Sequence, residues 1–138
     1  MTAICFDGKT IAADRLATRG NVRVGYRKKI EKWSGGVFAT AGNYGEEELF
    51  REWLENGARK SVKLGKKFTA LYTENGKVYH VSNSLKPYET FAPHGIGTGG
   101  EACEVLIREG YTAAEAVKAV SKFNTTVGGK VDTYIVTP

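Results

Sequence analysis

The residue with the clearest potential for chemistry is Thr2, which directly follows the initiator methionine. If Met1 is removed, the Thr2 hydroxyl and a free α-amine lie on the same residue. An α-amine has a pKa of about 7.7–8.0, so a good part of it is an unprotonated base near neutral pH. An N-terminal threonine can therefore act as nucleophile and as its own general base. The alternative interpretation is that Thr2 is an ordinary residue at the edge of a strand.

The first fourteen residues must position Thr2. Two short runs, 2–6 and 9–13, flank the pair Asp7-Gly8. This pair favours the type I′ turn of a tight β-hairpin. We therefore predict a hairpin that begins at the terminus itself, with no signal peptide before it. If the pairing is centred on Asp7-Gly8, Asp14 falls opposite Met1.

Composition and length limit the class of protein. A chain of 138 residues with 41% hydrophobic residues predicts a single globular domain spanning residues 1–138. No apolar run approaches the roughly 20 residues of a membrane span, so we expect a cytoplasmic protein without a membrane partner. The net charge of +5 permits acidic partners without indicating one.

The cysteines and histidines imply no metal or cofactor. Cys5 and Cys103 lie in apolar contexts without a CxxC spacing, so we predict reduced thiols in the core. His80 and His94 are each isolated from other ligand-type residues along the chain, which disfavours a zinc site.

Periodicity and turn residues predict four strands, a helix, two strands, two helices and a last strand. Asn43 and Glu46 have capping-box spacing at the start of the first helix, and Thr112 and Glu115 have it at the start of the third. Asn75-Gly76 marks a second hairpin. Because the helices are segregated from hairpin-connected strands, we predict an α+β fold.

Two segments are interpreted as irregular. Residues 14–21 are polar and predict a turn, and residues 83–93 contain Pro87 and Pro93 and predict a loop. The glycine-rich segment 95–100 follows and opens onto the second helix.

Several motifs, taken in order along nearly the whole chain, resemble the proteasome β-subunit and its bacterial relatives, the N-terminal-nucleophile (Ntn) hydrolases. These motifs are Ile11-Ala-Ala-Asp14, Lys28-Lys29-Ile30, Ala41-Gly42, Gly97-Thr98-Gly99-Gly100 and the segment from Asn124 to Gly129. The small size and the opening Thr-x-Ile-x-aromatic-Asp-Gly-Lys also resemble stand-alone proteasome-like proteins encoded by bacteriophages. The resemblance implies a four-layer αββα sandwich of antiparallel sheets.

The resemblance also implies a role for each matched position. Thr2 would be the nucleophile, with Lys29 lowering the pKa of its hydroxyl and Asp14 orienting Lys29. The backbone N–H of Gly42 would stabilise the tetrahedral oxyanion, an interaction commonly worth about 3–4 kcal/mol. Thr98 would take the place of a serine near the α-amine.

Some positions depart from the pattern. Asn124 stands where an active subunit usually has aspartate, Val127 where it has serine, and Leu16 replaces a common arginine. The first hairpin is also shorter than in the family, which would displace Thr2 by a step or more. A displacement of about 1 Å can cost about 100-fold in rate.

We therefore predict a threonine-type hydrolase of peptide or amide bonds that assembles as a homo-oligomer, in a ring or stacked rings. Its substrate would be a polypeptide or another amide. The sequence specifies neither ring size, nor substrate preference, nor an ATPase partner. The alternative is a catalytically inactive protein of the same fold that serves as a scaffold or binds another protein.

Two other readings of the sequence are weaker. Gly95-x-Gly97-x-x-Gly100 fits a dinucleotide fingerprint, but the preceding residues 88–94 do not form an apolar strand and no βαβ unit follows. The connection 59–67 contains five Lys or Arg residues with few aromatic residues. We interpret it as a solvated or inter-subunit loop and expect no nucleic-acid partner.

Overall fold

The computed structural model describes residues 2–20, 22–57 and 61–137. A first sheet has the strand order β10-β1-β2-β11, with β1 Ile4–Phe6, β2 Thr10–Ala13, β10 His94–Ile96 and β11 Asp132–Ile135. A second sheet has the order β5-β6-β7-β8-β9, with β5 Ile30–Trp33, β6 Gly36–Ala41, β7 Thr69–Glu74, β8 Lys77–Ser82 and β9 Tyr88–Glu89. The hairpin of β3 Leu16–Arg19 and β4 Val22–Tyr26 forms a separate sheet. The helices are α1 Glu46–Glu55, α2 Gly100–Arg108 and α3 Ala113–Ser121.

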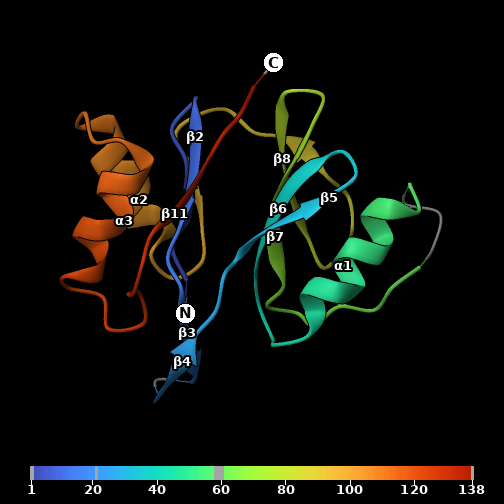
Figure 1. Ribbon diagram of the computed structural model, residues 1–138, viewed down its shortest axis with the longest axis horizontal. Coiled ribbons are helices and arrows are strands. Elements are labelled where there is room, and N and C mark those ends of the chain that lie inside the picture. Colours follow the sequence, from blue (N-terminus) through green and yellow to red (C-terminus); the bar gives the residue numbers. More distant parts are fainter. Residues whose placement is uncertain (1, 21, 58–60, 138) are drawn as a thin grey trace.

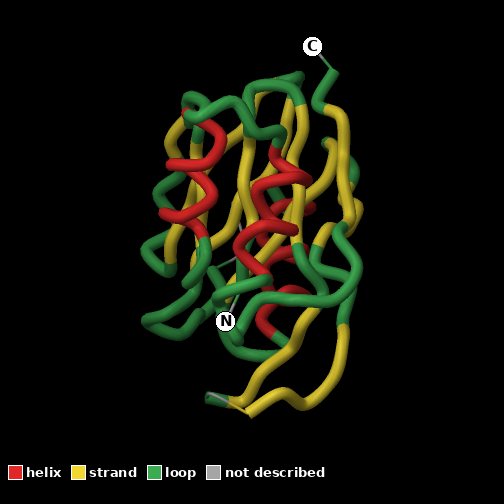
Figure 2. The backbone as a smooth tube through the Cα atoms, turned by 90° about the vertical axis from the view of Figure 1, so that its left-hand side faces the viewer, coloured by secondary structure: helices red, strands yellow, loops and turns green. Residues whose placement is uncertain are grey.

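The two larger sheets stack face to face between helices (Figure 1). Helices α2 and α3 cover the outer face of the first sheet, and α1 covers the outer face of the second (Figures 1 and 2). All strand pairs are antiparallel. The predicted α+β sandwich with the layer order αββα is therefore confirmed.

Three hydrophobic clusters hold the four layers together. The cluster between the sheets includes Ile4, Ile11 and Leu71. The cluster under α2 and α3 includes both predicted core thiols, Cys5 and Cys103, which are buried and free. The third cluster lies under α1, where Phe50 is fully buried among the rings of Phe38, Trp53, Phe68 and Tyr72. Burying one such ring is worth about 1.5–3 kcal/mol.

Two local predictions are confirmed in detail. Asn75 and Gly76 both have positive φ, 53° and 75°, as the type I′ turn between β7 and β8 requires. At the start of α3 the Thr112 hydroxyl accepts from the Glu115 N–H (3.2 Å), and the Glu115 carboxylate accepts from the Thr112 N–H (2.9 Å). Each signal is local, so neighbouring residues alone determine it.

Three local predictions are wrong. The stretch 14–21 contains β3, whose hairpin with β4 projects from the sandwich (Figure 1) and leaves Val22 and Val24 exposed. The β3 sequence Leu16-Ala-Thr-Arg19 does not alternate apolar and polar residues, so its pattern did not indicate a strand. The predicted loop 83–93 contains β9, which is paired to β8, and β10 follows it, paired to β1. Helix α1 has Gly45 as its N-cap and no side-chain cap in the described structure, although the Glu46 carboxylate accepts from the Asn43 N–H (2.7 Å).

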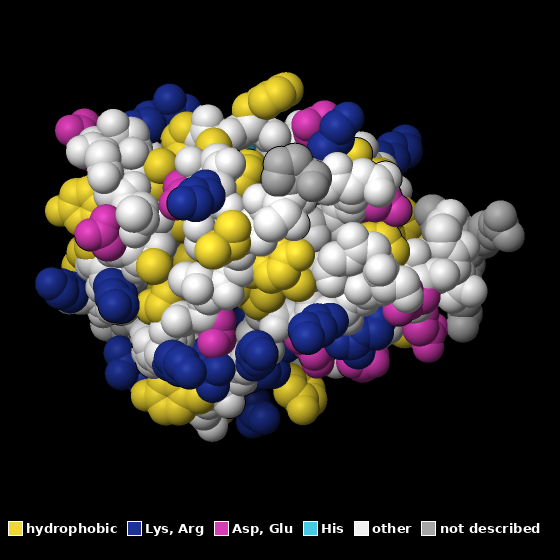
Figure 3. Space-filling view, turned by 45° about the horizontal axis from the view of Figure 1, so that its top comes forward, with side chains coloured by type: hydrophobic (Ala, Val, Ile, Leu, Met, Phe, Trp, Pro, Cys, Tyr) yellow, Lys and Arg dark blue, Asp and Glu magenta, His cyan; other side chains and the backbone are white. Residues whose placement is uncertain are grey.

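None of the described helices combines the length and the apolar character needed to cross a bilayer. On the face shown in Figure 3, Lys and Arg side chains are interspersed with acidic and hydrophobic ones. Residues 58–60, part of the basic connection 59–67, lie outside the described residues.

The two histidines, isolated in the sequence, contact each other across the two sheets. His94 Nε2 on β10 lies 2.9 Å from His80 Nδ1 on β8. The Tyr88 hydroxyl is 2.7 Å from the same nitrogen, and Thr69 Oγ1 is 2.7 Å from His80 Nε2. Burial and the neighbouring His94 lower the pKa of His80 to about 4, and burial lowers the pKa of His94.

This histidine pair predicts a stability loss in mild acid. Since an unfolded histidine has a pKa of about 6.5, the unfolded chain binds more protons than the folded chain between about pH 6.5 and pH 4. We expect the pair to contribute about 1–2 kcal/mol of unfolding free energy at pH 7 that disappears as the pH falls through this window. Urea unfolding followed by tryptophan fluorescence measures it. The variant His80→Gln should show a flatter profile between pH 7 and pH 4, and an unchanged profile would contradict the prediction.

Candidate active site

The first hairpin determines where Asp14 lies relative to Thr2. Asp7 Oδ1 accepts from the N–H groups of Lys9 (2.9 Å) and Thr10 (2.7 Å), and the Asp7 N–H donates to the Thr10 carbonyl (3.2 Å). Asp7 therefore precedes the turn, and Gly8 and Lys9 form its centre. The resulting register pairs Ile4 with Ala13.

The expected position of Asp14 opposite Met1 is therefore wrong by two residues. Asp14 lies opposite Ala3, to whose carbonyl the Asp14 N–H donates (3.2 Å). Asp14 therefore lies opposite the residue that follows Thr2. The pairing differs because the two-residue turn is centred on Gly8 and Lys9, one position later than the sequence suggested.

Thr2, Asp14 and Lys29 meet in the interior. Lys29 Nζ donates to Thr2 Oγ1 at 2.9 Å and to Asp14 Oδ1 at 2.7 Å. The side chain of Lys29 is 2% exposed and that of Asp14 is fully buried. Asp14 also accepts from the N–H groups of Ala3 (3.0 Å) and Gly128 (3.1 Å). Since both carboxylate oxygens are engaged, Asp14 has one orientation and holds the ammonium group against the Thr2 hydroxyl.

Lys29 presents a buried positive charge to this hydroxyl. Burial is the largest influence and lowers the pKa of Lys29, with Arg27 acting in the same direction. Asp14 opposes it by stabilising the charged ammonium. The net shift is downward. A buried ammonium 2.9 Å from a hydroxyl stabilises the alkoxide form of that hydroxyl.

Gly42 directly follows β6 at a position where a side chain would clash with its neighbours. Its φ is 157°, and a Cβ there would lie 2.8 Å from Glu46 Oε1 and 3.2 Å from Phe68 Cα. The Glu46 carboxylate also accepts from the N–H groups of Asn43 and Gly65, which holds the loop after β6 in place. The described structure shows no hydrogen bond donated by the Gly42 N–H.

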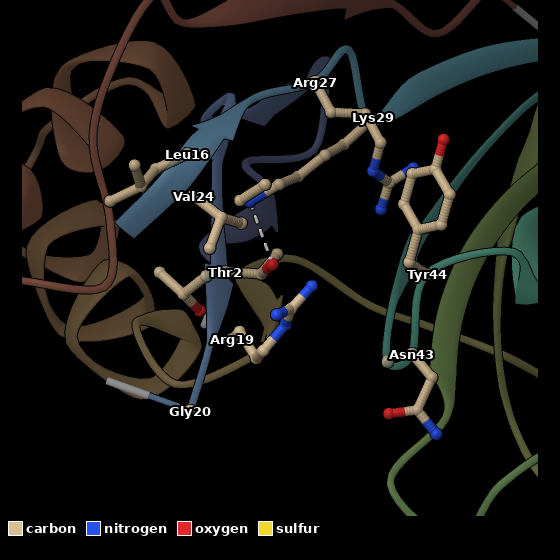
Figure 4. A pocket seen from close by; sticks show the side chains of 12 residues that line it. Thr2, Leu16, Arg19, Gly20, Val24, Arg27, Lys29, Asn43 and Tyr44 are labelled. Carbon is tan, nitrogen blue, oxygen red and sulfur yellow. Dashed lines mark hydrogen bonds between the residues drawn. The ribbon is translucent and has the colours of Figure 1, made fainter. Parts of the chain in front are cut away.

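A pocket of about 480 Å³ joins these elements. Its walls come from Thr2 with Lys29, from the hairpin of β3 and β4, and from the loop 42–44. In Figure 4 the Lys29 side chain reaches Thr2 from one wall, while Asn43 and Tyr44 form the opposite wall. Thr2, only 5% exposed, thus faces a cavity large enough for a substrate side chain.

Comparison with known proteins identifies the fold. No family profile and no curated protein matches the chain. Two structures of Thiobacillus denitrificans BPH are similar to this chain, each at 16% sequence identity. The structure in complex with epoxomicin has a TM-score of 0.73, and the match covers 100% of both chains. The structure described without epoxomicin has a TM-score of 0.70, and the match covers 99% of this chain and 98% of that chain. HslV from Trypanosoma brucei is also similar (TM-score 0.72, 16% identity, 97% of each chain). This chain has the proteasome-type Ntn-hydrolase fold.

Within this proteasome-type fold, the glycine-rich turn holds Thr2 in place. The Gly99 N–H donates to the Thr2 carbonyl at 3.0 Å. Gly97 has a φ of 85°, and a Cβ there would lie 2.3 Å from the Thr2 carbonyl oxygen. The close approach of the two backbones explains why the turn needs glycine. It accounts for the Gly95-x-Gly97-x-x-Gly100 pattern without a nucleotide.

The polar support of the Thr2 nitrogen differs from the pattern that the resemblance implied. The Thr2 N–H donates to Thr98 Oγ1 at 3.3 Å, which lies 2.9 Å from Thr126 Oγ1. The Thr126 hydroxyl donates to Asn124 Oδ1 at 2.7 Å. Val127, at the position of the usual serine, is buried in the core under α3. Thr126, one residue earlier, supplies the hydroxyl instead.

The direction of this chain of hydrogen bonds is determined by Asn124. Its Oδ1 also accepts from the Thr126 backbone N–H at 2.9 Å, so this oxygen is an acceptor for both groups of Thr126. Thr126 Oγ1 can then accept from Thr98, and Thr98 Oγ1 accepts from the Thr2 nitrogen. We refer to Thr98, Thr126 and Asn124 as the hydroxyl relay.

The structure thus brings together Thr2, Asp14, Lys29 and Thr98 from the predicted set, and places Gly42 on the same pocket. Sequence reasoning missed Thr126. The adjacent Thr125-Thr126 pair, beside a position that lacks the usual serine, was the one available signal for it.

Proposed function

We propose that this protein is an N-terminal-threonine hydrolase of peptide or amide bonds. The observation that carries the proposal is the contact between Lys29 Nζ and Thr2 Oγ1 at 2.9 Å, made by a buried lysine held by Asp14 and open to a pocket. A surface lysine face or a structural turn would require neither this burial nor this contact. After removal of Met1, the Thr2 nitrogen becomes the α-amine at the start of the hydroxyl relay.

The proposed reaction has two steps. The Thr2 α-amine takes the proton of the Thr2 hydroxyl while Oγ1 attacks the amide carbon, and Lys29 stabilises the developing alkoxide. The Gly42 N–H donates to the oxyanion of the tetrahedral intermediate. The C–N bond then breaks, the leaving amine receives the proton, and Thr2 carries the acyl group as an ester. Water, deprotonated by the same α-amine, hydrolyses the ester and regenerates Thr2.

The proposal includes a polypeptide or amide substrate, a cytoplasmic location and assembly as a homo-oligomeric ring. Support comes from the similarity to BPH and HslV, since a proteasome-type fold is associated with ring-type oligomers and peptide substrates. The bacteriophage origin expected from the small size remains a prediction.

The experiment that tests the proposal is the intact mass of the purified protein, before and after incubation with epoxomicin. We expect a mass lower by one methionine residue, and a further mass increase with epoxomicin, the compound bound in one of the similar BPH structures. Fluorogenic peptides then report turnover. Quantitative retention of Met1 by a host with normal methionine removal would reject the N-terminal nucleophile and favour the scaffold alternative.

The hydroxyl relay predicts the pH dependence of this activity. Asn124 ends the relay with a neutral amide, whereas the variant Asn124→Asp ends it with a carboxylate that stabilises the protonated α-amine. Lys29 and Asp14 face Thr2 in both proteins and are unchanged. Since the base must be unprotonated, we expect the acid limb of the kcat/KM profile to move up by about 0.5–1 pH unit in the variant.

Ser121→Asp, which adds the same charge at the end of α3, is the matched control and should leave the acid limb in place. An acid limb that moves down in Asn124→Asp, or that moves equally in both variants, would refute the role assigned to the relay.

A further inference from the structure

We propose that the pocket beside Thr2 recognises a carboxylate of the substrate, from an acidic side chain next to the scissile bond. The inference rests on the proposed function, because it names the substrate class of the same site. Three cationic side chains line the pocket: Arg19, Arg27 and Lys29. They come from the end of β3, from the segment after β4 and from the residue before β5.

The charges of the pocket do not cancel. Lys29 is paired with buried Asp14 at 2.7 Å. Arg27 has a long contact of 3.8 Å with Glu47, and its guanidinium lies 5.9 Å from the centre of the Tyr44 ring. Among the described residues, Arg19 has no carboxylate within ion-pair distance. One guanidinium is therefore uncompensated and a second is only loosely paired.

The backbone conformation positions the side chains of Arg19 and Arg27 along the pocket. A register shift between Ala17 and Thr18 interrupts the pairing of β3 with β4 just before Arg19. Such a bulge re-orients the side chains that follow it. The Arg27 backbone is held by its N–H, which donates to the Arg15 carbonyl at 2.7 Å.

Figure 4 shows the outcome of this placement. The Arg19 guanidinium points into the space between Thr2 and Asn43, and the Arg27 guanidinium lies beside Tyr44 on the other side of that space. A carboxylate next to the attacked carbonyl would thus lie between two guanidinium groups. Guanidinium binds carboxylate through paired, charge-assisted hydrogen bonds, which are stronger than neutral ones.

The competing interpretation is a pocket for an apolar side chain, since Leu16 and Val24 also line it. A leucine side chain would bury apolar surface there, but it would also take water from Arg19 without giving this guanidinium a carboxylate. Removing charged groups from water without compensation is costly. A carboxylate avoids this cost, so the charges decide the preference.

The test uses four fluorogenic peptides that differ only in the residue before the scissile bond: Glu, Gln, Leu and Lys. Glu and Gln have the same shape, so their ratio isolates the charge. We expect kcat/KM for Glu to exceed that for Gln by about tenfold at low salt, and the ratio to shrink in 0.5 M NaCl, where the screening length is about 4 Å. A second set of internally quenched peptides has Glu or Gln directly after the scissile bond. Faster hydrolysis of the Glu peptide in this set would place the recognised carboxylate on the leaving-group side of that bond.

Two variants assign the preference to the pocket. Arg19→Gln should reduce the Glu-to-Gln ratio to about one-third or less. Arg19→Glu should make Lys the preferred residue. Arg108→Gln, the same change on the exposed end of α2, should leave the ratio unaltered.

The outcomes separate this inference from the proposed function. Turnover of all peptides with a Glu-to-Gln ratio near one in both sets would overturn carboxylate recognition and leave the hydrolase intact. Absence of turnover with every peptide would reject the hydrolase. Calorimetry would then measure how tightly the unmodified protein binds the Glu and Gln peptides, and this comparison would decide whether the pocket recognises a carboxylate. Equal affinity for the two peptides would overturn it, and tighter binding of the Glu peptide that Arg19→Gln removes would support it.

Discussion

Replacing Thr2 with alanine is expected to reduce peptide hydrolysis at least about 10⁴-fold, to the background rate. The substitution removes the oxygen that forms the acyl ester, while the α-amine and Lys29 remain. A nucleophile and its base act as a unit, so losing either one removes most of the rate enhancement. The fold should survive, because Lys29 keeps its 2.7 Å contact with Asp14 and the Thr2 backbone keeps its contacts with Thr98 and Gly99.

Two matched variants separate the hydroxyl from the amine. Thr2→Ser retains both groups and should keep measurable turnover and reaction with epoxomicin. Insertion of one glutamate between Met1 and Thr2 leaves the hydroxyl in the chain but converts the α-amine into a peptide nitrogen, so it should abolish activity as Thr2→Ala does. Full activity in Thr2→Ala would refute the proposed mechanism. Activity in the insertion variant would mean that another group is the base.

Replacing Lys29 with methionine is expected to affect both catalysis and stability. Methionine has a similar length but no charge, so the Thr2 hydroxyl loses its cationic neighbour. We expect kcat/KM to fall by at least about 10³-fold. The same substitution leaves Asp14 as a buried carboxylate without its counter-charge, which typically costs about 3–5 kcal/mol of unfolding free energy. Chemical denaturation and peptide turnover, measured on the same preparation, give the two effects.

A double variant distinguishes catalysis from folding. Combining Lys29→Met with Asp14→Asn removes both charges, so part of the lost stability should return while activity stays absent. Asn can accept from only one of the two N–H groups that Asp14 binds, those of Ala3 and Gly128, so recovery should be incomplete. Retained activity in Lys29→Met would reject the role of Lys29, and recovery of activity in the double variant would show that the lysine matters only for folding.

Local signals predicted those elements whose determinants are close in sequence. The Asn75-Gly76 turn and the Thr112–Glu115 capping box each depend on a few adjacent residues, and the structure confirms both. Amphipathic patterns likewise predicted helices α1 to α3, because a buried face imposes a helical period. The resemblance to Ntn hydrolases predicted the layer order of the fold.

The register of the first hairpin was not accessible to local reasoning. Asp7 accepts from Lys9 and Thr10 within its own turn, but its second oxygen accepts from the Ala113 N–H at the start of α3 (2.9 Å). The residue that shapes the turn is thus held by a partner 106 positions away in the chain. The centre of the turn lies one residue later than Asp7-Gly8, which shifts the pairing by two residues and places Asp14 opposite Ala3.

The sequence by itself determined which residues could do chemistry: a threonine at position 2, an aspartate, a lysine and a glycine in an ordered set of motifs. It also determined the local turns and helix starts, because their partners are neighbours along the chain. Only the tertiary structure decided that Lys29 reaches Thr2, that Thr126 replaces a missing serine, that His80 meets His94, and that Arg19 faces the pocket without a carboxylate. Each of these depends on distance in space between distant segments, and packing of the two sheets and their helices sets that distance.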